Sequence, residues 1–334
     1  MDRLRAEADR LDALWRAGDT AAGLRLMAML DQLAVEQHGL RFRYIPAGTF
    51  RMGSVNGQPD ERPVHAVTLE GFWLTETPVS WADFCRVISW SPPPRSVPEV
   101  AEGEKVPFEI WNTNKIRLQY CEDRTRRARN WHAHVPEQLW QKGDQTVTSR
   151  ELFGEVPRED DSAWRYGGKP MVAVTWHQAR ELAEAMGPGF DLPTEAEWER
   201  AARGGHVDQP YPWGDAPPTP ERCDFDAFGR WVIQPSRSLP PNDYGLYAMS
   251  GGVWEWCLDH YDAGFYAESP ERAPLCRVEH PEAQYVLRGG SWADCAEACT
   301  VSFRMALGSV PTGAKDPWRA PKAPNVGLRM AWHG

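Results

Sequence analysis

The chain of 334 residues carries 47 Asp and Glu against 37 Lys and Arg, a net charge of −10, and 42% of its residues are hydrophobic. This length and apolar content support a buried core and exclude a chain that is disordered throughout. The negative charge argues against general binding to nucleic acid, because the phosphates of nucleic acid need a basic protein surface.

The first 39 residues predict a helical hairpin that precedes the main domain. One apolar stripe runs from Leu4 to Leu14 and a second from Leu24 to Leu30, both at helical spacing, and turn residues from Gly18 to Thr20 separate them. Three arrangements are open for this hairpin, residues 1–39: packing on the rest of the chain, self-association, and binding to a helix of a partner. We favour packing within the chain.

The chain also lacks the marks of export and membrane insertion. Its first residues, Met-Asp-Arg-Leu-Arg, do not have the pattern of a signal peptide. No apolar run reaches the roughly 18 residues that a membrane-spanning helix needs. We therefore expect a cytoplasmic protein without a membrane partner.

Strands and short helices are predicted to alternate after the hairpin. Residues 41–73 alternate polar and apolar side chains, which is typical of strands. Helices are predicted at 80–89, 176–186 and 195–203. Thr194 and Glu197 have the spacing of a capping box, so we assign the carboxylates of this region to the start of a helix rather than to catalysis. Helices beside many short strands predict an α+β domain.

The stretch from Asn242 to Trp256 combines a turn with a strand. Its first four residues, Asn-Asp-Tyr-Gly, are typical of a turn, and Val-Trp-Glu-Trp at its end is typical of a strand. Glu255 stands between two tryptophans. Because a carboxylate beside large aromatic rings is partly removed from water, Glu255 needs a cation or a hydrogen-bond donor as a partner.

Three stretches, 192–205, 242–256 and 287–292, combine glycine, tryptophan and charged residues in this way. Together and in this order, they resemble the formylglycine-generating-enzyme or sulfatase-modifying-factor family. The resemblance implies a variant of the C-type lectin fold over residues 40–334, with residues 91–165 as an insertion. Insertions of this length usually carry specificity or a contact surface. The resemblance does not fix an activity, because one fold hosts many functions.

Calcium is one cofactor that the resemblance implies. Members that bind calcium take oxygen ligands from the regions that correspond here to Asp224, Asp226 and Glu255, and such ligands suit this hard cation. The asparagine that usually precedes Val-Trp-Glu-Trp is Gly252 in this chain, which removes one side-chain ligand. We retain these three carboxylates as a candidate calcium site.

Copper is the cofactor of the family's oxidases, which convert a substrate cysteine to formylglycine. They hold Cu(I) with two cysteines that follow Gly-Gly-Ser-aromatic and are separated by four residues. Here Cys295 and Cys299 follow Gly289-Gly290-Ser291-Trp292 and are separated by three. The first cysteine also stands one position later than in the oxidases. An oxidase that uses this pair is the alternative function; otherwise the seven cysteines predict free thiols.

The C-terminal pattern also resembles the variable proteins of diversity-generating retroelements, which bind ligands on a C-type lectin scaffold. In these proteins the diversified positions lie between Gly-Gly-Ser-Trp and a closing Asn-x-Gly-φ-Arg, here residues 325–329. The resemblance makes residues 287–334 a candidate variable region. The candidate ligand-binding residues are Trp292, Ala293, Asp294, Cys295, Glu297, Ala298, Phe303, Met305 and Trp318.

We therefore predict an α+β, C-type-lectin-like fold of the formylglycine-generating-enzyme type with an N-terminal helical hairpin. The leading function is a non-catalytic module that binds a protein or a surface ligand through its C-terminal region, which suits a rigid scaffold that displays loops. A burial test separates the two functions. The oxidase needs both sulfur atoms together in a cleft, whereas the binding module needs Cys299 buried and the side chains of residues 293–298 exposed.

Overall fold

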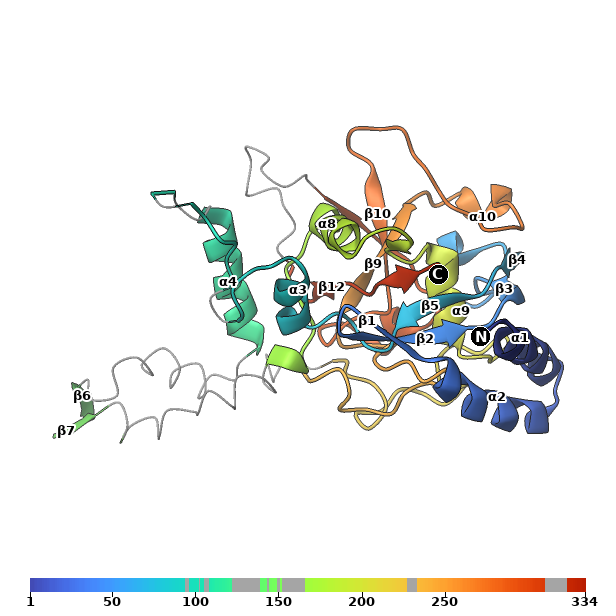
Figure 1. The fold of residues 1–334 in the computed structure, drawn as a ribbon, viewed down its shortest axis with the longest axis horizontal. Coiled ribbons are helices and arrows are strands. Elements are labelled where there is room, and N and C mark those ends of the chain that lie inside the picture. The colour runs from blue at the N-terminus through green and yellow to red at the C-terminus, as the bar shows by residue number, and fades with distance from the viewer. Residues whose placement is uncertain are drawn as a thin grey trace.

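The computed structural model describes the chain except for residues 94–95, 102, 105–107, 122–138, 143, 149–150, 152–165, 227–232 and 310–322. Two larger sheets organise the described part (Figure 1). The five-stranded sheet has the order β1-β2-β5-β13-β8, with strands Val35–Gln37, Leu40–Ile45, Phe72–Thr75, Ala331–Trp332 and Phe190–Asp191. The four-stranded sheet has the order β11-β10-β9-β12, with strands Met305–Gly308, Gln284–Arg288, Trp254–His260 and Val326–Gly327.

Two hairpins and several helices complete the described part. The hairpins are β3-β4 (Gly48–Met52 and His65–Leu69) and β6-β7 (Leu139–Lys142 and Gln145–Thr148). The α-helices are α1 (Asp2–Arg16), α2 (Thr20–Leu33), α3 (Trp81–Val87), α4 (Phe108–Cys121), α8 (Trp176–Met186), α9 (Glu195–Arg203) and α10 (Phe265–Glu268). Two short 3-10 helices are η1 (Pro59–Glu61) and η2 (Ala296–Cys299). The predicted α+β class is confirmed.

The N-terminal hairpin packs on the rest of the chain, as we favoured (Figure 1). The buried carboxylate of Asp12 in α1 accepts hydrogen bonds from Arg200 of α9, at 2.8 Å, and from the hydroxyl of Tyr244. Trp73 of β5 donates its indole N–H to the carbonyl oxygen of Leu33 at the end of α2, at 3.1 Å. The hairpin is therefore bonded to both α9 and the five-stranded sheet.

The predicted apolar stripe of α2 is correct at Leu30 and wrong at Leu24. Leu24 is 70% exposed, whereas Leu30 is buried together with Leu26 and Leu33. Leu14 of α1 is also exposed, at 38%. The sequence of α2 is apolar on more than one side, so spacing alone did not distinguish the face that packs on the domain.

The starts of the three predicted helices are confirmed. Ser80 accepts a hydrogen bond from the N–H of Asp83, and capping boxes form at the starts of α8 and α9, the second as predicted. In α9, the side chain of Thr194 accepts from the N–H of Glu197 while the carboxylate of Glu197 accepts from the N–H of Thr194. The assignment of Glu197 to helix capping is thereby confirmed.

Buried ion pairs join α9 to the four-stranded sheet. The carboxylate of Glu199 binds Arg203 at 2.6 Å and also binds Arg288 of β10. Glu195 binds Arg304 at 2.7 Å. Burial would raise the pKa of Glu199, but the charges of Arg203 and Arg288 outweigh it and lower this pKa. These ion pairs fix α9 against β10 and against the segment that carries Arg304.

Glu255 of β9 is buried in the core of the fold. Its carboxylate binds Arg329 at 3.0 Å and accepts the indole N–H of Trp198 at 2.6 Å. Both members of the ion pair are buried, at 1% and 0% exposure. The predicted need of this carboxylate for a cation or donor is confirmed, and the partners come from α9 and from the segment between β12 and β13.

Candidate ligand-binding site

A tight turn after β10 positions the predicted ligand-binding residues. Gly289 and Gly290 have φ of +99° and +70°, a backbone conformation that glycine adopts readily. A Cβ atom on Gly290 would lie 2.6 Å from the sulfur of Cys299 and 2.8 Å from the carbonyl oxygen of Ala298. Because this position has no side chain, the chain after β10 can pack directly against η2.

A polar cluster fixes the start of this turn. The carboxylate of Asp294 accepts the indole N–H of Trp254 at 2.8 Å and also the hydroxyl of Ser291. Asn325, which precedes β12, donates to the same serine hydroxyl at 2.9 Å. The main-chain carbonyl of Asp294 accepts from the N–H of Asp226 at 2.9 Å. Asp294 therefore anchors the turn to β9 and to the neighbouring loop.

Six predicted residues reach the surface around this anchor. Cys295 and Glu297 are exposed, and the other four are half-buried. We call these six residues the C-terminal surface: Ala293, Asp294, Cys295, Glu297, Phe303 and Met305. Phe303 packs on Trp254 with ring centroids 5.9 Å apart, so the aromatic part of this surface is supported by β9.

Two of the predicted ligand contacts are corrected by burial. Trp292 is only 2% exposed and packs in a small core cluster with Val172 and Val253, beside the ring of Tyr120. Ala298 is 7% exposed and faces the turn of Gly290. Neither side chain is available to a ligand. Trp318 lies outside the described residues.

Cys295 and Cys299 point into different environments. Cys295 is exposed, whereas Cys299 is fully buried. A hydrogen bond with Cys223 and burial raise the pKa of the Cys299 thiol. Counted from Gly-Gly-Ser-aromatic, the two cysteines of the oxidase pattern fall at positions 294 and 299, and the first is Asp294 here. The residues present therefore do not fit the two-thiolate copper site that the family's oxidases use.

The three carboxylates proposed for calcium are not brought together. Glu255 is occupied by Arg329 and Trp198, Asp224 is buried, and Asp226 is exposed on its loop. Across the residues that the structure describes, no group of three or more His, Cys, Asp or Glu side chains could hold a metal ion. The prediction of this calcium site is corrected because the charge of Glu255 is already balanced by a guanidinium.

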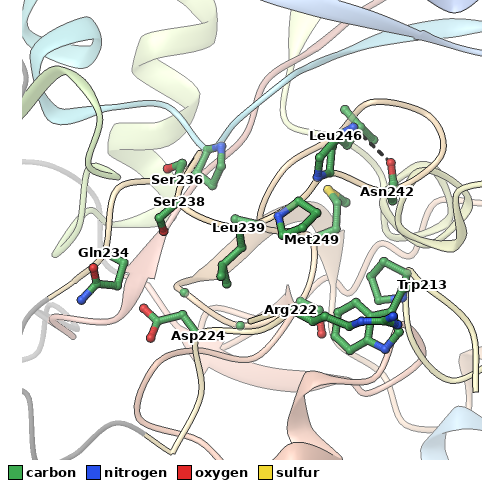
Figure 2. Close-up of a pocket in the computed structure, with 18 of the residues that line it drawn as sticks. Trp213, Arg222, Asp224, Gln234, Ser236, Ser238, Leu239, Asn242, Leu246 and Met249 are labelled. Carbon is green, nitrogen blue, oxygen red and sulfur yellow. Dashed lines mark hydrogen bonds between the residues drawn. The ribbon is translucent and has the colours of Figure 1, made fainter. Parts of the chain in front are cut away.

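A cavity lies on the other side of the loop that carries Asp224 and Asp226. Its volume is about 340 Å³, and most of its wall comes from residues 234–253. Figure 2 shows Leu239 and Met249 in the middle of the lining, Gln234 and Asp224 on one side, and Arg222 and Trp213 on the other. This volume falls in the range of sites for small molecules.

Sequence reasoning missed this cavity and also missed Cys223 as the neighbour of Cys299. A glycine lies at the cavity wall, and another glycine faces each of the two cysteines. A Cβ on Gly251 would lie 2.7 Å from the sulfur of Cys223, just as one on Gly290 would meet Cys299. Gly252 replaces the asparagine usual in the family, and its missing side chain lies at the cavity wall. The sequence contained these glycines, but the residues they face come from distant segments.

The fold and the turn after β10 together define the structural class of this protein. A protein in which Gly-Gly-Ser-Trp packs against the strand of Val-Trp-Glu-Trp, and in which a closing arginine binds the central glutamate, has the C-type-lectin-like architecture of the formylglycine-generating-enzyme type. The chain belongs to the family of sulfatase-modifying factor enzyme 1-like domains, which it matches over residues 34–333.

The relatives include enzymes, an inactive protein and kinases. The chain is 30% identical to the formylglycine-generating enzyme of Thermomonospora curvata over 285 residues, which cover 78% of this chain and 85% of that enzyme. It is 32% identical to the inactive C-alpha-formylglycine-generating enzyme 2 of Bos taurus over 308 residues, 86% of each protein. It is 34% identical to the serine/threonine-protein kinase pkn1 of Chlamydia pneumoniae over 248 residues. That match covers 74% of this chain and only 32% of the kinase, so the chain spans about a third of that protein.

Solved structures confirm the fold. PvdO from Pseudomonas aeruginosa superimposes with a TM-score of 0.58 at 18% identity, over 90% of this chain and 98% of PvdO. Treponema denticola variable protein 1 superimposes with a TM-score of 0.50 at 21% identity, over the same shares. At these identities the likeness concerns the fold alone. Within the described residues, no helix has both the length and the apolar character needed to cross a membrane.

Proposed function

We propose that this protein is a non-catalytic binding module that contacts a protein or surface ligand through its C-terminal surface. The observation that carries the proposal is the contrast within one turn: Cys299 is buried, while Cys295 and Glu297 are exposed. A binding scaffold needs exposed side chains on a rigid support. Asp294 supplies that support through its bonds to Trp254 and Ser291.

The chemistry of the C-terminal surface indicates what it would recognise. Asp294 and Glu297 are acidic. The pKa of Glu297 is lowered by hydrogen bonds from its own backbone N–H and from the Cys295 thiol. Phe303 adds an aromatic ring beside them. Carboxylates next to an apolar anchor suit a partner with basic groups around an apolar residue.

A finer proposal is that this module is the variable protein of a diversity-generating retroelement. It rests on the anchors at 289–292 and 325–329 and on the chemically mixed residues between them. Sequencing the gene segment for residues 287–334 from many isolates tests it. Substitutions should concentrate at the positions of the C-terminal surface other than the anchor Asp294, and should spare Gly289, Gly290 and Arg329. An even spread of substitutions along the chain would exclude diversification.

The binding proposal itself is testable because Cys295 is the exposed thiol among the seven cysteines. A maleimide photo-cross-linker attached to Cys295 should give a discrete cross-linked partner in extracts of the source cells, and Glu297→Ala, which leaves the Asp294 anchor intact, should weaken this cross-link. The matched control is Leu24→Cys in a Cys295→Ser background, which places the label on an exposed site of α2. Equal cross-linking from both positions would contradict the proposal.

The copper-dependent oxidase is tested separately. In anaerobic Cu(I) titration against a competing chelator, the wild type and the Cys295→Ser/Cys299→Ser double variant should be indistinguishable. Stoichiometric binding of Cu(I) that is lost in the double variant would support the oxidase as the function. In that case incubation with Cu(I), oxygen and a cysteine-containing peptide should produce an aldehyde that reacts with a hydrazide probe.

A further inference from the structure

We propose that a small crevice between α1, α9 and β3 binds a monatomic anion, chloride. Its volume is about 10 Å³, close to that of one water-sized sphere, so it accommodates a single small ion rather than a larger molecule. Four arginines line it: Arg16 of α1, Arg51 of β3, and Arg200 and Arg203 of α9. Figure 1 shows the three elements in the same part of the fold. We call this site the arginine crevice, and it shares no residue with the C-terminal surface.

The guanidinium of Arg200 has a nitrogen atom left for a ligand. The side chain is only 2% exposed, yet it lines the crevice. Its Nε and Nη2 donate to the carbonyl oxygen of Pro46 at 3.0 and 2.8 Å, and Nη2 also donates to the carboxylate of Asp12 at 2.8 Å. Within the described residues, Nη1 makes no hydrogen bond. Because buried donors without an acceptor are unfavourable, Nη1 favours an anion in the crevice.

Arg16 is a second cation without a full partner. Its side chain is 17% exposed, and its Nη1 lies 3.7 Å from the carboxylate of Asp12, which is beyond hydrogen-bonding distance. That carboxylate already accepts from Arg200 and from the hydroxyl of Tyr244. Burial and the charge of Arg200 lower the pKa of Arg16, although Asp12 acts in the opposite direction. Two guanidinium groups therefore share one buried carboxylate, which leaves an excess of positive charge beside the crevice.

The other two arginines of the crevice have their own partners. Arg203 binds the carboxylate of Glu199 at 2.6 Å. Arg51 binds Asp208 at 3.2 Å, and Asp208 is the one acidic residue among the described residues that line the crevice. Each of these two pairs is neutral as a whole. The excess positive charge available to an anion therefore comes from Arg16 and Arg200.

The carbonyl groups at the ends of α1 and α9 do not use up these donors. A helix C-terminus carries partial negative charge, which would oppose a bound anion. Here the N–H of Gly18 donates to the carbonyl of Trp15 at 2.8 Å, and the N–H of His206 donates to the carbonyl of Arg203 at 2.9 Å. These terminal carbonyls are thus bound by backbone N–H groups, and the free guanidinium nitrogens remain for the ion.

The dependence of stability on chloride tests the proposal. With methanesulfonate replacing chloride at constant ionic strength, the unfolding temperature of the wild type should rise by about 2 °C for each tenfold increase in chloride above the dissociation constant. Arg16→Gln removes one of the two cations, so its unfolding temperature should not change with chloride. Arg16→Lys keeps a charge without the planar fork of donors and should respond more weakly than the wild type.

The matched control is Arg10→Gln. Arg10 lies on the same helix but pairs with Glu7 on the exposed surface at 2.6 Å. This variant should respond to chloride as the wild type does.

Two measurements detect the ion directly. The NMR line of chloride should be broadened by the wild type and by Arg10→Gln but not by Arg16→Gln. Bromide should reverse this broadening, whereas sulfate, which is larger than the crevice, should not. In a crystal grown with bromide, the anomalous signal of the ion should lie between Arg16 and Arg200.

The proposal is overturned if the wild type and Arg16→Gln respond to chloride alike, or if the wild type shows no response below about 0.15 M chloride, a physiological ionic strength. A crystal without bromide in the crevice would show that the crevice holds water only. Displacement of chloride by sulfate as readily as by bromide would overturn the assignment to a monatomic anion. If Arg16→Gln does not fold, Arg16→Lys and the bromide crystal decide the question.

Discussion

At the scale of single residues, the fold depends on arginines that are buried and paired. Arg329 is fully buried, and its guanidinium donates to Glu255 and to the carbonyls of Thr75 and Tyr247. One side chain thus joins β5, β9 and the loop before β9. If the arginine is removed and its carboxylate partner is kept, that carboxylate remains buried as an uncompensated charge.

Arg329→Met should therefore destabilise the protein by about 3–5 kcal/mol, because Glu255 would stay buried without its cation. Urea unfolding followed by tryptophan fluorescence measures this change. Arg25→Met is the matched control, since Arg25 pairs with Glu7 on the exposed surface of the hairpin at 3.5 Å. Its effect should stay within about 0.5 kcal/mol. Similar losses from both variants would show that burial of the Glu255 pair is unimportant.

His333 provides a pH-dependent contact at the end of the chain. Its Nε2 lies 2.7 Å from the carboxylate of Glu197, and this hydrogen bond raises the pKa of His333 above its usual 6.5. Because the folded pKa is raised, the stability that the contact contributes is fully present below about pH 6.5 and is lost as the pH rises through the folded pKa.

His333→Gln should accordingly destabilise the protein at about pH 5.5 and have less effect as the pH rises towards about 9 through the folded pKa of His333. Thermal unfolding of both proteins across this range measures the difference. The unfolding temperatures of the two proteins should converge as the pH rises. A difference that stays constant with pH would mean that the charge of His333 does not contribute.

At the scale of elements, the turn after β10 and the helix η2 form one unit that Asp294 holds in place. Asp294→Ala should leave the indole N–H of Trp254 without its acceptor, which costs about 1–3 kcal/mol for a buried donor. The amides of residues 293–299 should then exchange with deuterium faster than in the wild type, because local opening becomes easier.

Glu297→Ala is the control within the same element. Glu297 is exposed on η2, so this change should alter stability by at most about 0.5 kcal/mol and leave exchange of the turn unchanged. If both variants speed exchange equally, the anchor lies elsewhere. If neither does, Asp294 is a surface residue of the turn and the rigid support argued for the C-terminal surface is absent.

Short-range patterns in the sequence predicted the starts of helices well. They did not identify contact partners that lie far apart in the chain. The capping residues Thr175 and Thr194 lie three positions from their partners, so the starts of α8 and α9 could be predicted. The sequence showed that Glu255 needs a partner but not that the partner is Arg329, which lies 74 positions away. Trp292 was a candidate ligand contact as an aromatic anchor of the candidate variable region, but tertiary packing with Tyr120 and Val253 buries it.

At the scale of the whole molecule, the N-terminal hairpin is part of the domain rather than an appendage. Asp12 is buried at 1% exposure, and its two carboxylate oxygens bind Arg200 and Tyr244, which come from α9 and from the turn before β9. Arg200 also donates to the carbonyl of Pro46, so the same guanidinium contacts the loop after β2. The hairpin and the domain therefore share one buried polar network.

Asp12→Ala should destabilise the entire protein by about 3–5 kcal/mol, because Arg200 would remain buried without its anion. Unfolding should still occur in one transition whether it is followed by tryptophan fluorescence or by helical circular dichroism, since the hairpin and the sheets share a core. Asp2→Ala is the control, because Asp2 pairs with Arg5 at the exposed start of α1. An Asp12→Ala protein in which helical signal is lost before the fluorescence changes would instead show that the hairpin is an independent unit, free to act as a partner-binding element.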